Sequence, residues 1–291
     1  VDVYQYGKIQ EISFERGNKT SDLKEIGTTD RTGTTVRFKP DAQIFETTIF
    51  EFDVLKTRLQ ELAFLNKGLR ITLTDKRGEG RSESFHYEGG LVQFIEYLNE
   101  AKEAITPSVI SIDNTRDDVV VDVALQYNDS YSETILSFVN NINTIDGGTH
   151  LSGFRTALTR TLNDYGRKAG ILKENESNLT GEDVREGLTA VVSVKVLEPQ
   201  FEGQTKGKLG NSEVKGITDT IVSDGLRVFL EEHPAEAKKI IEKATNASRA
   251  REAARKAREL TRRKNALEVS SLPGKLADCS EKDTTMTEIY L

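Results

Sequence analysis

Cysteine, methionine and tryptophan are almost missing from the 291 residues, which contain one, one and none of them. The lone thiol of Cys279 excludes an internal disulfide and a four-cysteine metal site, and it fits a reducing compartment. The three histidines are scattered and show no metal-ligand spacing. No apolar run approaches the roughly 18 residues that a membrane-spanning helix needs. We therefore expect a cytoplasmic globular protein with no membrane segment and no metal site in this chain.

An initiator methionine is also missing, because the chain opens with Val1 and its only methionine is Met286. Residues 1–6 already alternate like a strand, Gly7-Lys8 predicts a turn, and residues 9–14 predict a returning strand. A chain that opens inside a strand is expected to be a segment of a longer protein. Such a start neither shows nor excludes a signal peptide.

Charge of one sign dominates only part of the chain. The formal net charge is −7, which argues against a wholly basic nucleic-acid binder. Residues 249–264, however, hold eight basic side chains against two acidic ones. An acidic body with one basic segment predicts a local contact with a polyanion. The alternative is the solvated face of a helix, although such a face normally mixes both signs.

Periodicity and turn residues predict mixed α/β structure, and the length predicts two domains. Asp53 is expected to cap a helix whose Leu55, Leu59, Leu62 and Leu65 share one face. Gly89-Gly90 marks a boundary. Strands are expected at 33–38, 69–74, 82–87, 109–113, 119–127, 130–139 and 188–196. Further helices are expected at 91–104, 149–168, 212–232 and 234–266.

The last of these helices would be on the order of 50 Å long at 1.5 Å per residue. Pro234 is suited to its first turn. One face would carry small side chains that permit close packing against another element, namely Ala237, Ala244, Ala247, Ala250, Ala254 and Ala257.

Five short blocks carry a resemblance to a known family. They are Gly147–Arg155 (GGTHLSGFR), Arg185–Leu188 (REGL), Gln204–Lys206 (QTK), Ala250–Arg255 (AREAAR) and Leu272–Cys279 (LPGKLADC). In this order they resemble the B subunit of bacterial type IIA topoisomerases along nearly the whole chain, DNA gyrase first and topoisomerase IV second. Five ordered blocks are far more specific than any single motif.

The resemblance implies an α/β (α+β) architecture in which part of a GHKL-type ATPase sandwich precedes a transducer like ribosomal protein S5 domain 2. Residues 1–88 would be the C-terminal part of the ATPase domain. Residues 89–266 would be the transducer with its long C-terminal helix, and residues 267–291 a linker and the start of the TOPRIM domain. The family's catalytic glutamate and its ligand for Mg2+ would precede Val1. ATP and Mg2+ are thus expected cofactors of the full-length subunit, and this chain alone is expected to be inactive.

The resemblance also implies a function. The full-length subunit would be an ATP-dependent topoisomerase that drives one DNA duplex through another and introduces negative supercoils. Its partners would be double-stranded DNA, the gyrase A subunit and a second B subunit that dimerises on binding ATP. Decatenation by a topoisomerase IV-type subunit and a MutL-like ATP-operated DNA clamp are the alternatives. The Leu272–Cys279 block belongs to the topoisomerase layout and argues against the clamp.

Lys206 is the sharpest candidate for chemistry. It lies in a glycine-flanked turn, residues 203–207, from which a flexible ammonium group can reach a terminal phosphate. By resemblance Lys206 senses the γ-phosphate of ATP in the catalytic site, with Gln204 beside it as a second nucleotide-binding residue. Thr34 matches the threonine that holds adenine through its hydroxyl group and a water molecule. From composition alone, a solvated lysine and a strand-face threonine are the simpler interpretations.

Basic side chains of the family's transducer line a hole through which DNA passes. Arg155 is the first candidate for that lining and Arg185 the second, with surface or ion-paired arginines as the alternative. His150 is interpreted as a histidine that makes local hydrogen bonds at a helix start. The acidic residues 182, 183 and 186 are interpreted as capping residues rather than metal ligands. The basic run adds four expected DNA-binding residues, Arg251, Arg255, Arg258 and Arg262.

Overall fold

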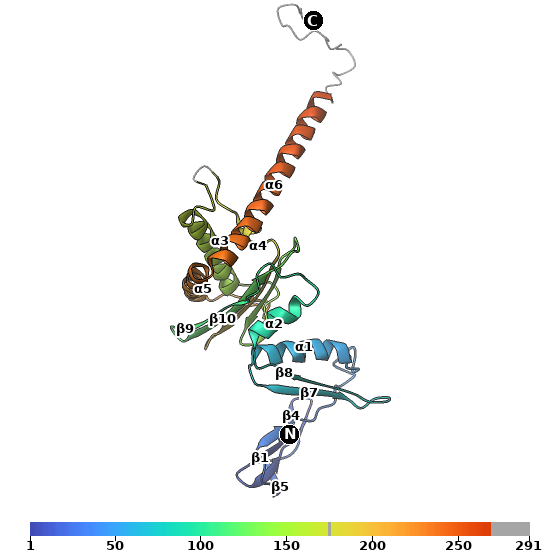
Figure 1. Cartoon of the computed structure of the whole chain (residues 1–291). Coiled ribbons are helices and arrows are strands. Elements are labelled where there is room, and N and C mark those ends of the chain that lie inside the picture. The colour runs from blue at the N-terminus through green and yellow to red at the C-terminus, as the bar shows by residue number, and fades with distance from the viewer. Residues whose placement is uncertain (174–175, 269–291) are drawn as a thin grey trace, which may run out of the picture. The chain divides into compact units, whose positions relative to one another are not determined.

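The computed structural model describes residues 1–173 and 176–268, and the side chains among them up to residue 261. The structure is mixed α/β, as the sequence predicts (Figure 1). The described residues divide into two compact units. Unit 1 comprises Val1–Arg58 and Leu73–Glu83. Unit 2 comprises Leu59–Thr72 and the described residues from Ser84 on.

Unit 1 contains a four-stranded antiparallel sheet in the order β5-β2-β1-β6. The first two strands form the predicted hairpin, but its turn lies at Tyr6-Gly7, where both φ angles are positive at 53° and 74°. Such a pair of angles is typical of tight hairpin turns. The strand expected at 33–38 ends after three residues. The strands are β1 (Asp2–Gln5), β2 (Lys8–Glu11), β3 (Phe14–Glu15), β4 (Asn18–Lys19), β5 (Lys24–Thr28) and β6 (Gly33–Thr35).

Helix α1 (Phe52–Leu65) begins one residue before the predicted cap, so the prediction that Asp53 caps it is wrong. The Asp53 carboxylate lies in the first turn and accepts a hydrogen bond from Arg81 Nη2 at 3.1 Å. Of the predicted leucine face, only Leu65 is buried, and the other three leucines are half-buried. Ala63 and Phe64 are buried beside Leu65 at the C-terminal end of the helix. The hairpin that follows is β7 (Arg70–Asp75) and β8 (Arg81–His86), as predicted.

Unit 2 is built on a five-stranded sheet in the order β12-β11-β13-β10-β9. Strands β11 and β13 run parallel, and the other neighbours are antiparallel. Neighbouring residues of β13 enter different cores: Val192 and Val194 join the larger one and Val191 the smaller one. Burial of both faces explains why this strand is apolar almost throughout. The strands are β9 (Ile110–Arg116), β10 (Val119–Tyr127), β11 (Thr134–Val139), β12 (Ile142–Asn143) and β13 (Leu188–Lys195).

Helices cover both faces of this sheet. Helix α2 (Leu91–Leu98) packs on one face, and α3 (Thr149–Lys168) and α5 (Ser212–Glu232) lie side by side on the other (Figure 1). Both of the latter match their predicted bounds. The five-residue helix α4 (Gly181–Arg185) was not predicted, and a capping box between Thr180 and Asp183 starts it. Of the three acidic residues expected to cap this segment, Asp183 does so.

Helix α6 (Pro234–Glu268) begins at the predicted proline. Its small face is buried at Ala237, Ala244 and Ala247, and the first two of these join the larger core with Ile240 and Ile241. The expected close packing of Ala250, Ala254 and Ala257 is not found, because these side chains are exposed. Within the described side chains, α6 therefore packs through its first half and presents its basic second half to solvent.

Gly153 sets the approach of α3 to α5. A Cβ atom at this position would lie 2.4 Å from the carbonyl oxygen of Lys215 and 3.1 Å from Cβ of Thr218. The glycine of the GGTHLSGFR block is therefore required by packing between two helix backbones. The basic side chains of α3 are held at their observed distance from α5 by this contact.

We predict that Gly153→Ala lowers the free energy of unfolding by about 1–3 kcal/mol through overpacking. Intrinsic helix propensity alone would favour alanine by about 1 kcal/mol. Gly216→Ala in α5 is the matched control, since nothing lies within 4 Å of its added methyl group. Urea unfolding monitored by circular dichroism distinguishes the two variants. Equal stabilisation by both would contradict the close approach.

Candidate functional site

The turn that carries Lys206 joins the short strands β14 (Phe201–Glu202) and β15 (Lys208–Leu209). Gln204 and Lys206 are both exposed. Lys206 has a positive φ of 56°, a conformation that is uncommon for a residue other than glycine. Its amide donates a hydrogen bond to the carbonyl of Gly203 at 3.3 Å. Its ammonium group has no ion-pair partner among the described residues.

The neighbouring Lys208 differs from Lys206 in this respect. Its ammonium group lies 3.1 Å from the carboxylate of Glu202 on the opposite strand. The hairpin therefore pairs Lys208 with its own Glu202 and leaves the ammonium group of Lys206 free to bind an anion. Sequence spacing alone did not distinguish these two lysines.

Residues 144–148 lie against this hairpin. The amide of Leu209 donates to the carbonyl of Gly147 at 3.1 Å, and the amide of Asp146 donates to the carbonyl of Gly207 at 2.9 Å. Gly148 and Leu209 also form a parallel bridge. The residues that directly follow the QTK block, Gly207 and Leu209, thus lie against the start of the GGTHLSGFR block, although the two blocks are far apart in the sequence.

A small buried polar cluster lies beneath this arrangement. Thr144 and Ser137 exchange hydrogen bonds of 2.8 to 3.0 Å, and the hydroxyl of Thr144 lies 3.3 Å from Nε2 of His150. His150 is fully buried, and burial lowers its pKa to about 4. The imidazole is therefore neutral at neutral pH. The Thr144 hydroxyl that contacts it is itself buried and donates to the carbonyl of Ser137, which agrees with the interpretation of a local structural histidine.

Thr34, the predicted adenine-binding residue, lies in unit 1. It is the middle residue of β6 and pairs with Val3 of β1. Its side chain is exposed, so its hydroxyl group is accessible to a ligand. Thr34 and Lys206 belong to different units, and the nucleotide roles of Thr34, Gln204 and Lys206 remain predictions.

Arg155 and Arg185, the predicted DNA-lining residues, share one carboxylate. Nη2 of Arg155 lies 3.3 Å from Glu133, and Nε of Arg185 donates to the other oxygen of the same carboxylate. The Arg185 side chain is only 18% exposed, against 41% for Arg155. One acidic group therefore offsets part of the charge of both arginines. Arg155 stays the better candidate for contact with DNA, because more of it is exposed.

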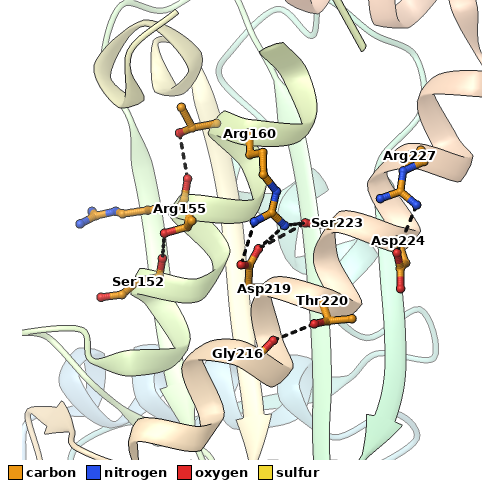
Figure 2. A network of polar contacts seen from close by, with 11 residues as sticks. Ser152, Arg155, Arg160, Gly216, Asp219, Thr220, Ser223, Asp224 and Arg227 are labelled. Carbon is orange, nitrogen blue, oxygen red and sulfur yellow. Dashed lines mark hydrogen bonds and ion pairs between the residues drawn. The ribbon is translucent and has the colours of Figure 1, made fainter. Parts of the chain in front are cut away.

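Arg160 is a basic residue that the sequence analysis did not single out. It reaches from α3 to α5, where its guanidinium group donates to Asp219 at 2.8 and 3.1 Å and to Ser223 at 2.7 Å (Figure 2). Arg155 points away from α5 in the same view (Figure 2). Arg160 thus joins the two helices, whereas Arg155 is presented on another side of α3.

The arginines of α6 fall into two groups. Arg251 donates to Asp183 at 2.7 Å and to Glu182 at 3.3 Å, and Asp183 is only 1% exposed. This contact joins α6 to α4 and favours a structural role for Arg251. Arg255 and Arg258 are exposed, and Arg255 has only a 4.0 Å contact with Glu259. The side chain of Arg262 and the whole Leu272–Cys279 block lie outside the described residues.

Glu182 and Asp183 both bind Arg251, and Asp183 also caps α4 through its hydrogen bonds with Thr180. The described part of the chain contains no cluster of three or more histidine, cysteine, aspartate or glutamate residues that could hold a metal ion. None of the helices in that part is long and apolar enough to cross a membrane.

Comparison with known proteins gives a consistent result. The family model described as DNA gyrase B matches residues 90–260. The chain is 59% identical to the DNA gyrase B subunit of Halalkalibacterium halodurans, over 100% of this chain and 46% of that protein. It is 59% identical to the DNA gyrase B subunit of Bacillus mycoides, over 100% of this chain and 72% of that protein. The chain thus spans about half the length of several curated relatives it matches.

Two solved structures show the same fold. The 43K ATPase domain of Thermus thermophilus gyrase B, in complex with an aminocoumarin, has a TM-score of 0.75 and 43% identity, covering 89% of this chain and 70% of that one. The topoisomerase IV ATP-binding domain of Francisella tularensis, in complex with an inhibitor, has a TM-score of 0.73 and 30% identity, covering 86% of this chain and 68% of that one.

The buried His150 predicts a specific dependence of stability on pH. Its pKa is about 4 in the folded protein and about 6.5 in an unfolded chain. The unfolded chain therefore takes up a proton that the folded chain excludes. The stabilisation is complete above about pH 6.5 and is lost as the pH falls towards about 4, by on the order of 3 kcal/mol.

His150→Gln should therefore lose less stability than the unsubstituted protein between these pH values, as measured by urea unfolding at several pH values. His233→Gln is the comparison variant, because it removes an imidazole that is only half-buried. An acid-induced loss that is identical in His150→Gln and the unsubstituted protein would contradict the assignment.

Proposed function

We propose that this chain, which belongs to the DNA gyrase B family, is part of an ATP-dependent type IIA DNA topoisomerase. Its part would couple ATP binding to the passage of one DNA duplex through another. Family membership favours negative supercoiling of DNA as the overall activity and the cytoplasm as its location. The lower identity to the topoisomerase IV domain makes decatenation the second candidate. The Leu272–Cys279 block argues against a MutL-like clamp.

The family's layout assigns a role to each part of the chain. We assign residues 1–88 to the C-terminal part of a GHKL-type ATPase domain, 89–266 to a transducer like ribosomal protein S5 domain 2, and 267–291 to the start of TOPRIM. Unit 1 supports the first assignment because it exposes an extensive apolar surface, as expected of part of a larger domain. Its exposed apolar residues include Val36, Phe38, Ile44, Phe45, Ile49, Phe50 and Val54.

The exposed turn at Lys206 carries this proposal. A free ammonium group at the tip of a hairpin is available to an anion, and the amide of Gln204 adds a neutral hydrogen-bond donor beside it. Both groups fit a terminal phosphate. The adenine at the other end of ATP would be bound by Thr34, whose hydroxyl group is exposed on β6.

Lys206 would distinguish the two nucleotides by charge and position. ATP has a γ-phosphate and ADP does not, so a contact between Lys206 and this group exists in only one of the two states. A ligand shifts a conformational equilibrium only through such a difference in contacts. Mg2+ would accompany ATP in the full-length subunit. The described residues offer no ligand cluster for it, and the role of Lys206 requires only its own positive charge.

DNA and two proteins are the proposed partners. The half-buried Arg155 of α3 and the exposed Arg255 and Arg258 of α6 would contact phosphates of the passing duplex, with Arg262 as a further residue of α6. Phosphate contacts of this kind carry no information on base sequence. The gyrase A subunit and a second B subunit are proposed from family membership.

Lys206→Ala in the full-length subunit should reduce ATP turnover by roughly 10²–10³-fold, as is typical when a preorganised charge is removed from a reaction site. DNA cleavage in the absence of ATP should stay intact. Lys208→Ala is a matched control, because Lys208 lies in the same hairpin but pairs with Glu202. Steady-state ATPase assays in the presence of DNA compare the variants. Normal turnover by Lys206→Ala would show that Lys206 is a surface lysine.

Duplex binding by the 291-residue chain should be weak and should fall steeply with salt. Each phosphate contact contributes about −0.9 to the slope of log K against log salt. Replacing Arg255, Arg258 and Arg262 with glutamine should flatten this slope by up to roughly 3 units. The measurement is fluorescence anisotropy with duplexes of two unrelated sequences, over a series of salt concentrations.

Arg251→Gln is the contrasting variant. Because Arg251 binds the buried Asp183, its loss should lower thermal stability and change the salt slope little. Glutamine nearly preserves helix propensity, so circular dichroism of the triple variant should be unchanged. A slope that the triple substitution leaves unaltered would return the basic run to the interpretation of a solvated helix face.

A further inference from the structure

The turn that carries Lys206 is attached to residues 146–148 through main-chain atoms. The two hydrogen bonds join Leu209 to Gly147 at 3.1 Å and Asp146 to Gly207 at 2.9 Å, so both lie on the C-terminal side of Lys206. Lys206 is therefore within one residue of an anchored position. A displacement of its backbone must either break the bond to Asp146 or move residues 146–148 with it.

Two glycines make this attachment possible. A Cβ at Gly148, where φ is +142°, would lie 2.6 Å from both the amide nitrogen and the carbonyl oxygen of Leu209. A Cβ at Gly207 would lie 2.5 Å from a carboxylate oxygen of Asp146. The first contact is with backbone and cannot be relieved without moving β15. The second is with the end of the short side chain of Asp146, whose own amide is bound to the carbonyl of Gly207. Relieving this contact must either turn that carboxylate aside or displace the turn.

The same segment leads directly into α3. The amide of Gly147 donates to the carbonyl of Thr144 at 2.8 Å, and the hydroxyl of Thr144 lies 3.3 Å from His150 in the first turn of the helix. Since Thr144 and His150 are buried, this end of α3 is held firmly. Further along the same helix lie Arg155 and Arg160.

We propose that Gly148 and Gly207 are positioning residues for Lys206: they let the turn sit on the start of α3, so that a contact of Lys206 with a γ-phosphate is transmitted to that helix. This inference rests on the proposed role of Lys206. It names the element that receives the signal, namely the first turn of α3. It also explains why the double glycine precedes this helix, since only glycine permits the close approach of Gly148 to Leu209.

Gly207→Ala is the test variant, because Gly148→Ala would disturb β15 itself. The added methyl group should shift the ammonium group of Lys206, and misplacement of a reacting group by about 1 Å can cost up to 100-fold in rate. We expect kcat for ATP hydrolysis by the full-length subunit with its partner subunit and DNA to fall by about 10- to 100-fold. The Kd for ADP, which has no γ-phosphate, should not change.

Two further variants make the test specific. Asp146→Ala removes the carboxylate that the methyl group would meet, so Gly207→Ala/Asp146→Ala should recover most of kcat. Lys206→Ala/Gly207→Ala should be no slower than Lys206→Ala alone, since residues that act as a unit are not additive. Gly216→Ala, where the methyl group meets open space, should behave as the unsubstituted protein.

The outcomes separate the two proposals. If Lys206→Ala is impaired while Gly207→Ala is normal, or if their effects on kcat simply add, the positioning role is wrong and the role of Lys206 stands. If Lys206→Ala itself is normal, both proposals are wrong. If Gly207→Ala loses thermal stability together with kcat, the Asp146→Ala double variant decides: recovery of kcat supports the positioning role, and continued loss overturns it.

Discussion

The contact between the backbones of Gly148 and Leu209 is the constraint on which the proposed site depends. It brings a hairpin of unit 2 against the start of α3, and a side chain on Gly148 would collide with Leu209 at 2.6 Å. Lys206 projects from that hairpin, and α3 carries Arg155. A residue suited to sensing a phosphate and a residue suited to contacting DNA are therefore joined by a short and largely main-chain connection.

Ion pairs organise the remaining helices around α3. Glu133 binds Arg155 of α3 and Arg185 of α4, and the buried Asp183 of α4 binds Arg251 of α6. Helix α4 is thus joined by ion pairs to Glu133 and to α6, and the charges of Arg185 and Arg251 are partly neutralised within the protein. Further along α6, Arg258 has no ion-pair partner among the described side chains and Arg255 has only its 4.0 Å contact with Glu259, which is why binding of polyanions is assigned chiefly to these two arginines.

Much of the fold could be predicted from local sequence patterns. The periodicity of α3 and α5 gave their bounds, and the apolar run of β13 correctly indicated a strand buried on both faces. The predictions that failed depend on tertiary contacts. Asp53 pairs with Arg81 instead of capping α1, Ala254 is exposed because no described element packs on the second half of α6, and α4 is too short for periodicity to reveal.

For the site, the sequence identified the residues and the structure identified their partners. The QTK and GGTHLSGFR blocks were recognised separately, and no pattern showed that the end of the QTK hairpin lies against the double glycine. Long-range hydrogen bonds between main-chain atoms leave little trace in side-chain identity. The double glycine at 147 and 148 was the one sequence feature that indicated a close approach of another backbone segment. Likewise, the exposed Arg160 resembled any other surface arginine until its contacts with Asp219 and Ser223 were seen.

Hydrogen exchange on the full-length subunit tests the central claim most directly. A non-hydrolysable ATP analogue, compared with ADP, should slow amide exchange both in residues 203–209 and in residues 144–150, and neither region should respond in Lys206→Ala. This result would show that the phosphate contact reaches the start of α3. Protection confined to residues 203–209, with unchanged exchange in residues 144–150, would contradict the connection proposed between Lys206 and α3.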